Sequence, residues 1–246
     1  MACASKNISR LEIGRLLGLM RTKKYIVYTQ PYKLNIVGIR RANTNPIRFD
    51  DALYVFWKTD NNKWAGKEYV ITTDPSTKYL EQGGIGSYEG QKATAILPHG
   101  QYVDKWVIKK HNGSYDALGQ DKELCVYRDY DRNSTLTFDV GSKDCGKFGI
   151  NIHHAKSGGA DDGQGNTAYI GAYSAGCQVF QNYYCFLEFM DMAKKQRELY
   201  GNPFTYTLFD LSLRRKYLIK RAAYSAIVVA SASLIIYGAS LVSKSK

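Results

Sequence analysis

The central part of the chain consists of short β-forming runs, and this texture limits the fold more than any other feature of the sequence. Between about residues 25 and 179, segments such as "KYIVYT", "ALYVFWKT" and "KEYVITT" are rich in Val, Ile, Tyr and Trp. Gly, Asn, Asp and Pro separate these segments, as expected for strands joined by turns. Because no sustained helical period interrupts them, an antiparallel sheet, sandwich or barrel is favoured over an α/β fold.

Helical patterns flank the β-rich part. Near the start, Ser9 and Glu12 have the spacing of a capping box, and the apolar positions 8, 11, 16 and 20 lie roughly on one helical face. We therefore predict an N-terminal amphipathic helix within residues 1–24, which either docks on its own domain or lies on a membrane surface. A second helix is predicted after residue 180, with apolar residues on one face and an end at Gly201.

The C-terminal segment has no charged residue between positions 222 and 242. As a helix it would span about 31 Å, the thickness of a bilayer core. Lys and Arg residues flank it on both sides, more heavily on the N-terminal side. We predict a single-pass transmembrane anchor over 222–242, preceded by a basic linker over 201–221, with the main domain on the side of synthesis. The alternative is a buried core helix, because the segment also holds several Ser and Ala residues.

Positive charge is concentrated at the two ends of the chain. The formal net charge is +12, of which +5 lies in residues 1–24 and +7 in residues 214–246, so the body between them is neutral. A nucleic-acid-binding domain normally carries a basic face on its folded body. We therefore predict no nucleic-acid partner and favour contact with an anionic lipid surface.

The five cysteines show no regular spacing: Cys3, Cys125, Cys145, Cys177 and Cys185. No Cys-x-x-Cys pair or Cys/His cluster with zinc spacing is present. The sequence therefore predicts neither a disulfide scaffold nor a bound metal or cofactor, and the odd number leaves at least one thiol unpaired. Cys125, Cys145 and Cys185 are predicted to be buried apolar side chains. The acidic pair Asp161/Asp162, in a Gly-rich segment, is predicted as a surface loop.

Cys177 is the strongest candidate for chemistry. It follows Ser174, Ala175 and Gly176 in "SAGC", where small residues leave space and a glycine permits a sharp turn. A cysteine nucleophile needs a base and backbone N–H groups that stabilise an oxyanion. Upstream, "INIHHA" is predicted to be a strand, in which alternate side chains share a face. His153 shares its face with the polar Asn151, so His153 is the favoured base. The alternatives are a buried thiol and a core histidine.

These motifs resemble the catalytic domain of the L,D-transpeptidase family. In that family an Ile-x-Ile-His-like segment precedes a loop and then Ser-His-Gly-Cys, usually with Arg two residues after the cysteine. "INIHHA" and "SAGC" match these elements, and "AILPHGQYV" (95–103) resembles the family's Thr-Pro-x-Gly-x-Tyr segment. Ala175 and Val179 stand where the family has His and Arg. The similarity covers about residues 93–181.

The resemblance implies an L,D-transpeptidase-like β-sandwich over 93–200, after a β-rich region over 25–92 that is either a separate domain or additional strands of the same sheet. It implies that Cys177 is acylated by a peptidoglycan stem peptide, with His153 as base and with Ser174 and Gly176 shaping the oxyanion region. Further candidates for substrate binding are His154, Tyr173, Gln178 and Arg128, although Arg128 equally fits a surface ion pair. His111, Tyr115 and Gln120, in the Gly-containing loop "KKHNGSYDALGQ", are further polar candidates.

Two functions follow as hypotheses. The first is a membrane-anchored cysteine transpeptidase or peptidase that acts on peptidoglycan stem peptides. The second is a membrane-tethered structural protein that keeps the fold without the activity, such as a minor capsid protein that contacts other virion proteins at a virion membrane.

Overall fold

A closed sheet forms the centre of the computed structural model, which describes residues 3, 5–41, 45–85, 87–88, 90–137 and 143–211. Eight strands follow one another around it, and β3 pairs with β4 to close the ring. In spatial order they are β4 (Trp64–Thr72), β13 (Gln178–Phe180), β12 (Ile152–His154), β9 (Tyr115–Gln120), β8 (Gly100–His111), β14 (Phe204–Asp210), β2 (Asn35–Arg40) and β3 (Asp51–Lys58).

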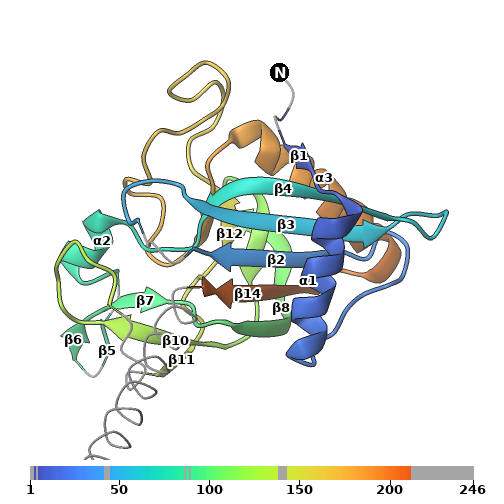
Figure 1. Cartoon of the computed structure of the whole chain (residues 1–246). Helices are drawn as coiled ribbons and strands as arrows, with labels where there is room; N and C mark the ends of the chain where they lie inside the picture. Colours follow the sequence, from blue (N-terminus) through green and yellow to red (C-terminus); the bar gives the residue numbers. More distant parts are fainter. Residues whose placement is uncertain are drawn as a thin grey trace, which may run out of the picture.

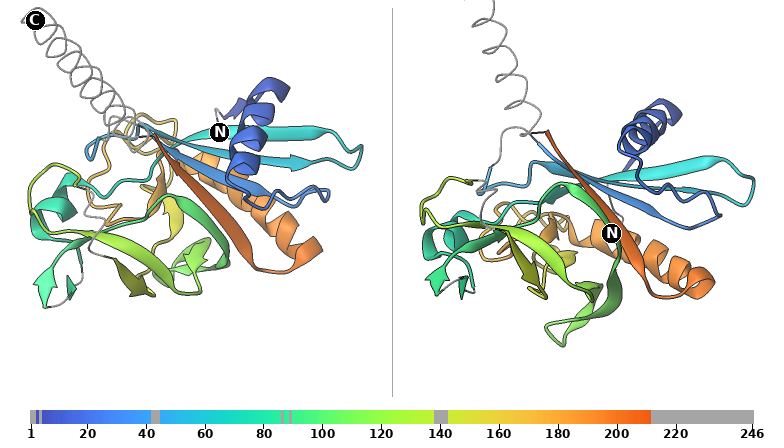
Figure 2. Two further views of the ribbon diagram at one scale, coloured as in Figure 1. Left: turned by 60° about the horizontal axis from the view of Figure 1, so that its bottom comes forward. Right: turned by 90° about the horizontal axis from the view of Figure 1, so that it is seen from below.

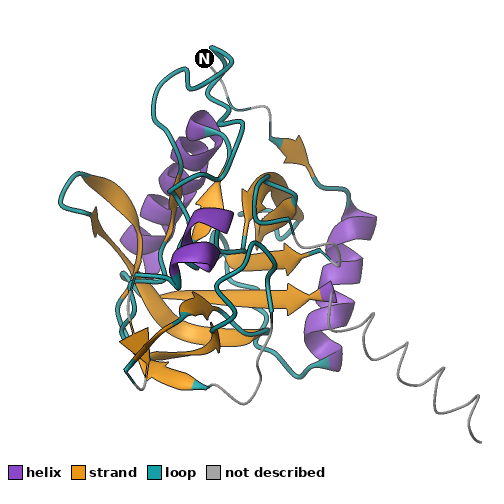
Figure 3. Ribbon diagram, turned by 90° about the vertical axis from the view of Figure 1, so that its left-hand side faces the viewer, coloured by secondary structure: helices purple, strands orange, loops and turns teal. Residues whose placement is uncertain are grey.

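Smaller strands and three helices complete the described structure (Figures 1 and 3). β1 (Lys6–Asn7) extends the sheet at β4, and β10 (Leu124–Asp129) pairs with β7 (Thr94–Ile96) and β11 (Asp144–Gly146) in a separate sheet. β5 (Ser87–Tyr88) and β6 (Gln91–Lys92) form a short hairpin. The helices are α1 (Arg10–Thr22), α2 (Thr77–Gln82) and α3 (Tyr183–Tyr200).

The prediction of a mainly β fold is confirmed, but the strands close into a barrel and do not form two stacked sheets. Around this ring, the strands from residues 25–92 (β2, β3 and β4) form one contiguous block, and those from residues 93–200 (β13, β12, β9 and β8) form another that pairs with it directly through β13 and β4. The first region therefore supplies additional strands of the same sheet. Alternation along β3 shows how the ring is packed, since Leu53 and Val55 join the main core while Tyr54 and Phe56 face α1.

The two long helices pack on opposite faces of the β2–β3–β4 part of the sheet (Figure 2). The capping box at the start of α1 is confirmed, because Ser9 and Glu12 each bond to the other's backbone N–H. α1 docks on its own domain through Ile13, Leu16, Leu17 and Met20, whereas Leu11 is exposed, contrary to the predicted face. α3 is capped by Gly201, as predicted, and its buried apolar face includes Phe186, Phe189, Met190 and Ala193.

The segment predicted as a basic linker contains a central strand. Every residue of β14 is buried, and the strand pairs in parallel with β2 and antiparallel with β8. "FTYTLFD" is rich in aromatic and β-branched residues, which favour strands, so the linker assignment is wrong for Phe204–Asp210. The predicted membrane anchor over 222–242 lies outside the described residues. Within the described part of the chain, no helix is both long and apolar enough to cross a membrane.

Two disulfides correct the expectation that the cysteines are unpaired. Cys3 bonds to Cys185 of α3, and Cys125 bonds to Cys145 across the β10–β11 pair. Irregular spacing hid both pairs, because the first joins the N-terminal segment to a helix 182 residues away. Cys177 is the free cysteine of the five.

Candidate active site

Parallel pairing of β12 with β13 brings the two sequence motifs together. Ile152 pairs with Gln178 and His153 with Val179, so Cys177 comes opposite Asn151 just before the two strands begin. The Gln178 backbone N–H donates to the Asn151 carbonyl at 2.9 Å and fixes this register. Since side chains alternate along strands, Asn151, His153 and Cys177 belong to the same face.

A cavity of about 570 Å³ opens on this face, and both Cys177 and His153 line it. The titratable side chains on its wall are imidazoles, phenols and the one thiol, and the described lining includes no carboxylate, lysine or arginine. Electrostatics in this cavity therefore depend on hydrogen bonding and burial. The main polar and aromatic members of the lining are Tyr79, His111, Tyr115, Asn151, His153, His154, Tyr173 and Cys177.

The Cys177 thiol is held between two backbone groups. Its Sγ accepts from the Asn151 N–H at 3.4 Å and donates to the Gly149 carbonyl at 3.4 Å. Burial raises the pKa of the thiol to about 11, an effect that the hydrogen bond from Asn151 only partly offsets. At neutral pH the resting side chain is therefore a thiol, so this cysteine is not a preformed thiolate.

His153 is buried and neutral. Its Nδ1 lies 2.8 Å from the His154 carbonyl, which can only accept, so Nδ1 carries the proton and Nε2 keeps its lone pair. Burial, with a smaller contribution from the repulsion that a charged His111 would exert, lowers the pKa of His153 to about 3. The ring is therefore in the form that can accept a proton at Nε2 throughout the physiological pH range.

The "SAGC" loop is shaped by Ser174 and Gly176. The buried Ser174 Oγ lies within hydrogen-bond distance of the Asp74 and Cys177 carbonyls and accepts from the Gly176 N–H at 3.3 Å. Gly176 has φ of 119°, and a Cβ there would lie 2.5 Å from the Ala95 carbonyl oxygen, so only glycine fits. Because the Gly176 amide is already bonded to Ser174, both residues set the shape of the loop.

Not all of the predicted substrate-binding residues reach the cavity. His154 and Tyr173 line it, but Gln178 is fully buried and accepts from the Tyr206 hydroxyl at 2.8 Å. Arg128 is ion-paired with Asp144 at 2.6 Å and is not part of the cavity lining. Gln178 therefore faces the core, and Arg128 lies behind the lining residue Phe148, with its guanidinium 4.8 Å from the centre of that ring.

The structure adds His111 and Asn151 to the site. His111 lies outside the motifs around Cys177 and His153, and nothing in those motifs connects the β8–β9 hairpin to Cys177. In the fold, the His111 ring stacks on His153 with centroids 4.2 Å apart, and Asn151 Nδ2 lies 3.1 Å from His111 Nδ1. The only sequence signal was the position of Asn151 on the same strand face as His153.

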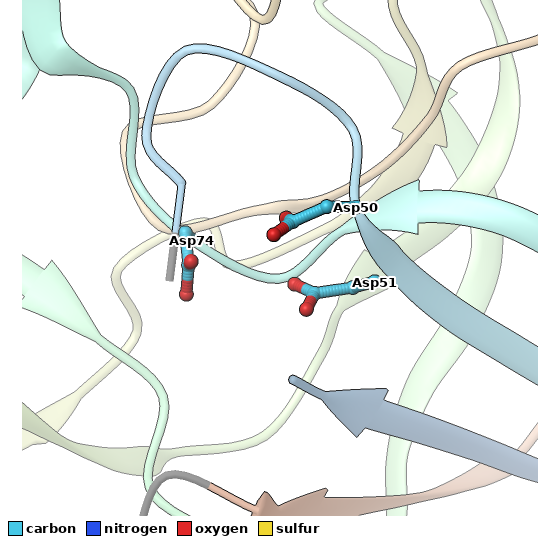
Figure 4. Close-up of side chains that lie close together, drawn as sticks. All are labelled: Asp50, Asp51 and Asp74. Atoms are coloured by element: carbon cyan, nitrogen blue, oxygen red, sulfur yellow. The ribbon is translucent and has the colours of Figure 1, made fainter. Parts of the chain in front are cut away.

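Three carboxylates gather away from this cavity (Figure 4). Oxygens of Asp50, Asp51 and Asp74 lie within 4.8 Å of one another, and carboxylate oxygens are ligands for Ca²⁺ or Mg²⁺. A cation is already present, because Arg40 is buried and pairs with Asp74 at 2.9 Å and with Asp210 at 3.1 Å. We assign the cluster as a structural ion-pair network next to the support of the Ser174 loop.

Comparisons of the chain with models of known protein families, with curated proteins and with solved structures gave no match. The function proposed below therefore rests on the geometry of the cavity and on the sequence motifs.

Proposed function

We propose that the chain is a cysteine acyltransferase or peptidase of the L,D-transpeptidase type that acts on peptidoglycan stem peptides. One observation carries the proposal: the single free thiol, Cys177, lies immediately before β13, the neutral base His153 lies in the paired strand β12, and both line the same cavity. A nucleophile and a base brought together in a cavity are the minimum for acyl transfer through a covalent intermediate.

The neutral resting state determines how the thiol is activated. As Sγ attacks the substrate carbonyl carbon, its proton passes to His153 Nε2, and the carbonyl electron pair moves to the oxygen. The tetrahedral intermediate collapses, the C–N bond breaks, and His153 returns the proton to the leaving amine. Water or a second amine then attacks the thioester, gives its proton to His153, and Cys177 leaves and regains that proton. The Cys177 backbone N–H is the oxyanion donor that we assign, since Ser174 engages the Gly176 amide.

The surroundings of the cavity suit an extended peptide. A second cavity of about 860 Å³ shares Tyr115, His154, Ala155 and Tyr173 with the first, so the two cavities adjoin and together offer room for more than one residue of a peptide. Disulfides persist in oxidising compartments, and peptidoglycan lies outside the cytoplasmic membrane, so the two disulfides support an external substrate. They favour the opposite side of the membrane from the one that the flanking charges predict for the main domain. The uncharged segment 222–242 is proposed to hold the domain at a membrane.

The deciding experiment incubates the wild-type chain and Cys177→Ala with purified peptidoglycan fragments and follows stem peptides by mass spectrometry. The expected result is cleaved or exchanged stem peptide with the wild type and none with the variant. Addition of an amine acceptor distinguishes transpeptidation from hydrolysis, since exchange product increases with acceptor concentration only in the former. Absence of product in both samples would overturn the proposal and favour a structural role.

A further inference from the structure

His111 lies against the proposed base but belongs to neither motif. It ends β8 at the β8–β9 hairpin, is half-buried, and lines the Cys177 cavity. Its ring is nearly parallel to that of His153, with an interplanar angle of 18° and centroids 4.2 Å apart. This contact leaves no room for water between the two rings, so the charge of one is felt directly by the other.

Asn151 determines which nitrogen of His111 carries the proton. The Gln120 backbone N–H donates to Asn151 Oδ1 at 2.9 Å, which orients the amide. The Asn151 NH₂ group then points at His111 Nδ1, 3.1 Å away, and an NH₂ group can only donate. This shorter and more buried contact makes Nδ1 the acceptor, so neutral His111 carries its proton on Nε2, and protonation of Nδ1 would bring two donors face to face. Asn112 Nδ2 lies 3.4 Å from His111 Nε2 on the exposed side of the ring, so this tautomer requires the Asn112 amide to turn its Oδ1 toward the ring.

Other groups around His111 act in the same direction. Burial lowers the pKa of His111, and no described carboxylate lines the cavity to oppose this shift. The titratable groups that face the ring are His153 and His154 on β12, Tyr115 on β9, and Cys177 before β13. None of these groups carries a negative charge at pH 7 that would stabilise a protonated His111, and the histidines among them would repel it if they were protonated. His111 is therefore kept uncharged.

We propose that His111 is a positioning residue for acylation: its ring, held neutral by Asn151, stacks on His153 and stabilises the imidazolium that forms when His153 takes the Cys177 proton. The inference rests on the proposed function. A neutral aromatic face attracts a cation, whereas a protonated His111 would repel the developing charge. By keeping His111 neutral, Asn151 thus prevents a charged His111 from repelling the imidazolium of His153 and slowing acylation.

The test compares His111→Phe, His111→Ala and Asn151→Asp with the wild type, after circular dichroism shows that each variant is folded. We expect His111→Phe, which keeps an aromatic face, to stay within about threefold of the wild-type kcat, and His111→Ala to lose about tenfold or more with little change in KM. Asn151→Asp keeps the acceptor for Gln120 but places a carboxylate at Nδ1, which favours charged His111.

In Asn151→Asp, kcat/KM is expected to fall about tenfold between pH 8 and pH 6, where the wild type stays flat. The double variant Asn151→Asp/His111→Phe is the matched control, because it has the carboxylate but no titratable ring, and it should lose this acid limb. A wild-type rate in His111→Ala, or an acid limb that persists in the double variant, would overturn the inference.

A second readout separates this inference from the proposed function. The imidazole protons of His111, followed by NMR, should titrate at a lower pH in the wild type than in Asn151→Asp, because burial lowers the pKa of His111 and the introduced carboxylate raises it. If the wild type makes no product from peptidoglycan, the proposed function fails, and the titration then decides whether Asn151 holds His111 neutral. Identical titration in both proteins would contradict this inference even if turnover is observed.

Discussion

Asn151 and Cys177 face each other immediately before β12 and β13, and the Asn151 N–H lies 3.4 Å from the Cys177 sulfur. The contact links two segments 26 residues apart. Because the strands are parallel, the same register that places Asn151 beside the thiol also places His153 one step along the shared face. The properties of the candidate site follow from this pairing.

Alkylation of Cys177 should be slow at neutral pH. With a pKa of about 11, the fraction of Cys177 present as thiolate is about a hundredfold lower than for an ordinary thiol. A thiolate of higher pKa is intrinsically more nucleophilic, and this recovers about tenfold of the hundredfold loss in rate. We expect iodoacetamide to react about tenfold more slowly than with free cysteine at pH 7, and the rate to rise up to pH 10 or above. A rate above that of free cysteine at pH 6–7 would show a preformed thiolate and contradict the neutral pair.

His153 and His154 form a matched pair for testing the base. His153→Gln should lower kcat by about 10²- to 10⁴-fold, the usual contribution of a general base. His154→Gln should mainly raise KM, because His154 lines both cavities and bonds through Nδ1 to the Ala155 carbonyl. Steady-state kinetics on a stem-peptide substrate provides the comparison, and equal losses of kcat in both variants would rule out the assignment.

Gly176 and Gly158 test whether the nucleophile loop requires glycine. Both have positive φ, 119° and 67°, but a Cβ at Gly158 meets nothing within 4 Å, while one at Gly176 would collide with the Ala95 carbonyl. Gly176→Ala should therefore reduce the free energy of unfolding by about 2–4 kcal/mol and Gly158→Ala by about 1 kcal/mol. Urea denaturation measures both values, and similar losses would mean that the loop can move away from Ala95.

The disulfides should contribute measurably to stability. Removal of the Cys3–Cys185 bond with a double Ala variant should lower the free energy of unfolding by about 2–5 kcal/mol, because the bond closes a very long loop in the unfolded chain. Alkylation of the unfolded protein without reductant should label one thiol, on Cys177. More than one label per chain would show that a disulfide is absent.

Asp50 should make the protein less stable as the pH rises. Burial and the neighbouring Asp51 raise the pKa of Asp50 from 3.8 to about 6. The folded state thus binds a proton more tightly than the unfolded state, and stability decreases between about pH 4 and pH 6. Since the side chain is only about half buried, we expect Asp50→Asn to gain about 1–2 kcal/mol at pH 8 and nothing below pH 4.

Asp162→Asn is the matched control, because the pKa of Asp162 is shifted in the opposite direction from that of Asp50. Hydrogen bonds from Asn166 and Gln164 lower the pKa of Asp162, so its contribution is present at high pH and is lost as the pH falls. This variant should show no gain at pH 8. Thermal denaturation across the pH range measures both variants, and a pH-independent effect of Asp50→Asn would contradict the raised pKa.

Local patterns in the sequence were sufficient to predict those features that depend on residues close together along the chain. The capping box at Ser9 and Glu12, the buried face of α3, the mainly β composition and the shared face of Asn151 and His153 follow from short-range spacing. The motif "SAGC" also required a tight turn, and Gly176 occupies a conformation that suits glycine.

Tertiary structure decided what depends on contacts between distant segments. Closure of the sheet, the burial of β14 in its centre and the pairing of Cys3 with Cys185 arise from packing between segments that local patterns do not relate. The same holds for His111, whose place on His153 is set by the β8–β9 hairpin. The sequence by itself determined which residues can perform chemistry, whereas their pKa values and protonation states were decided by burial and hydrogen bonding, which exist only in the folded chain.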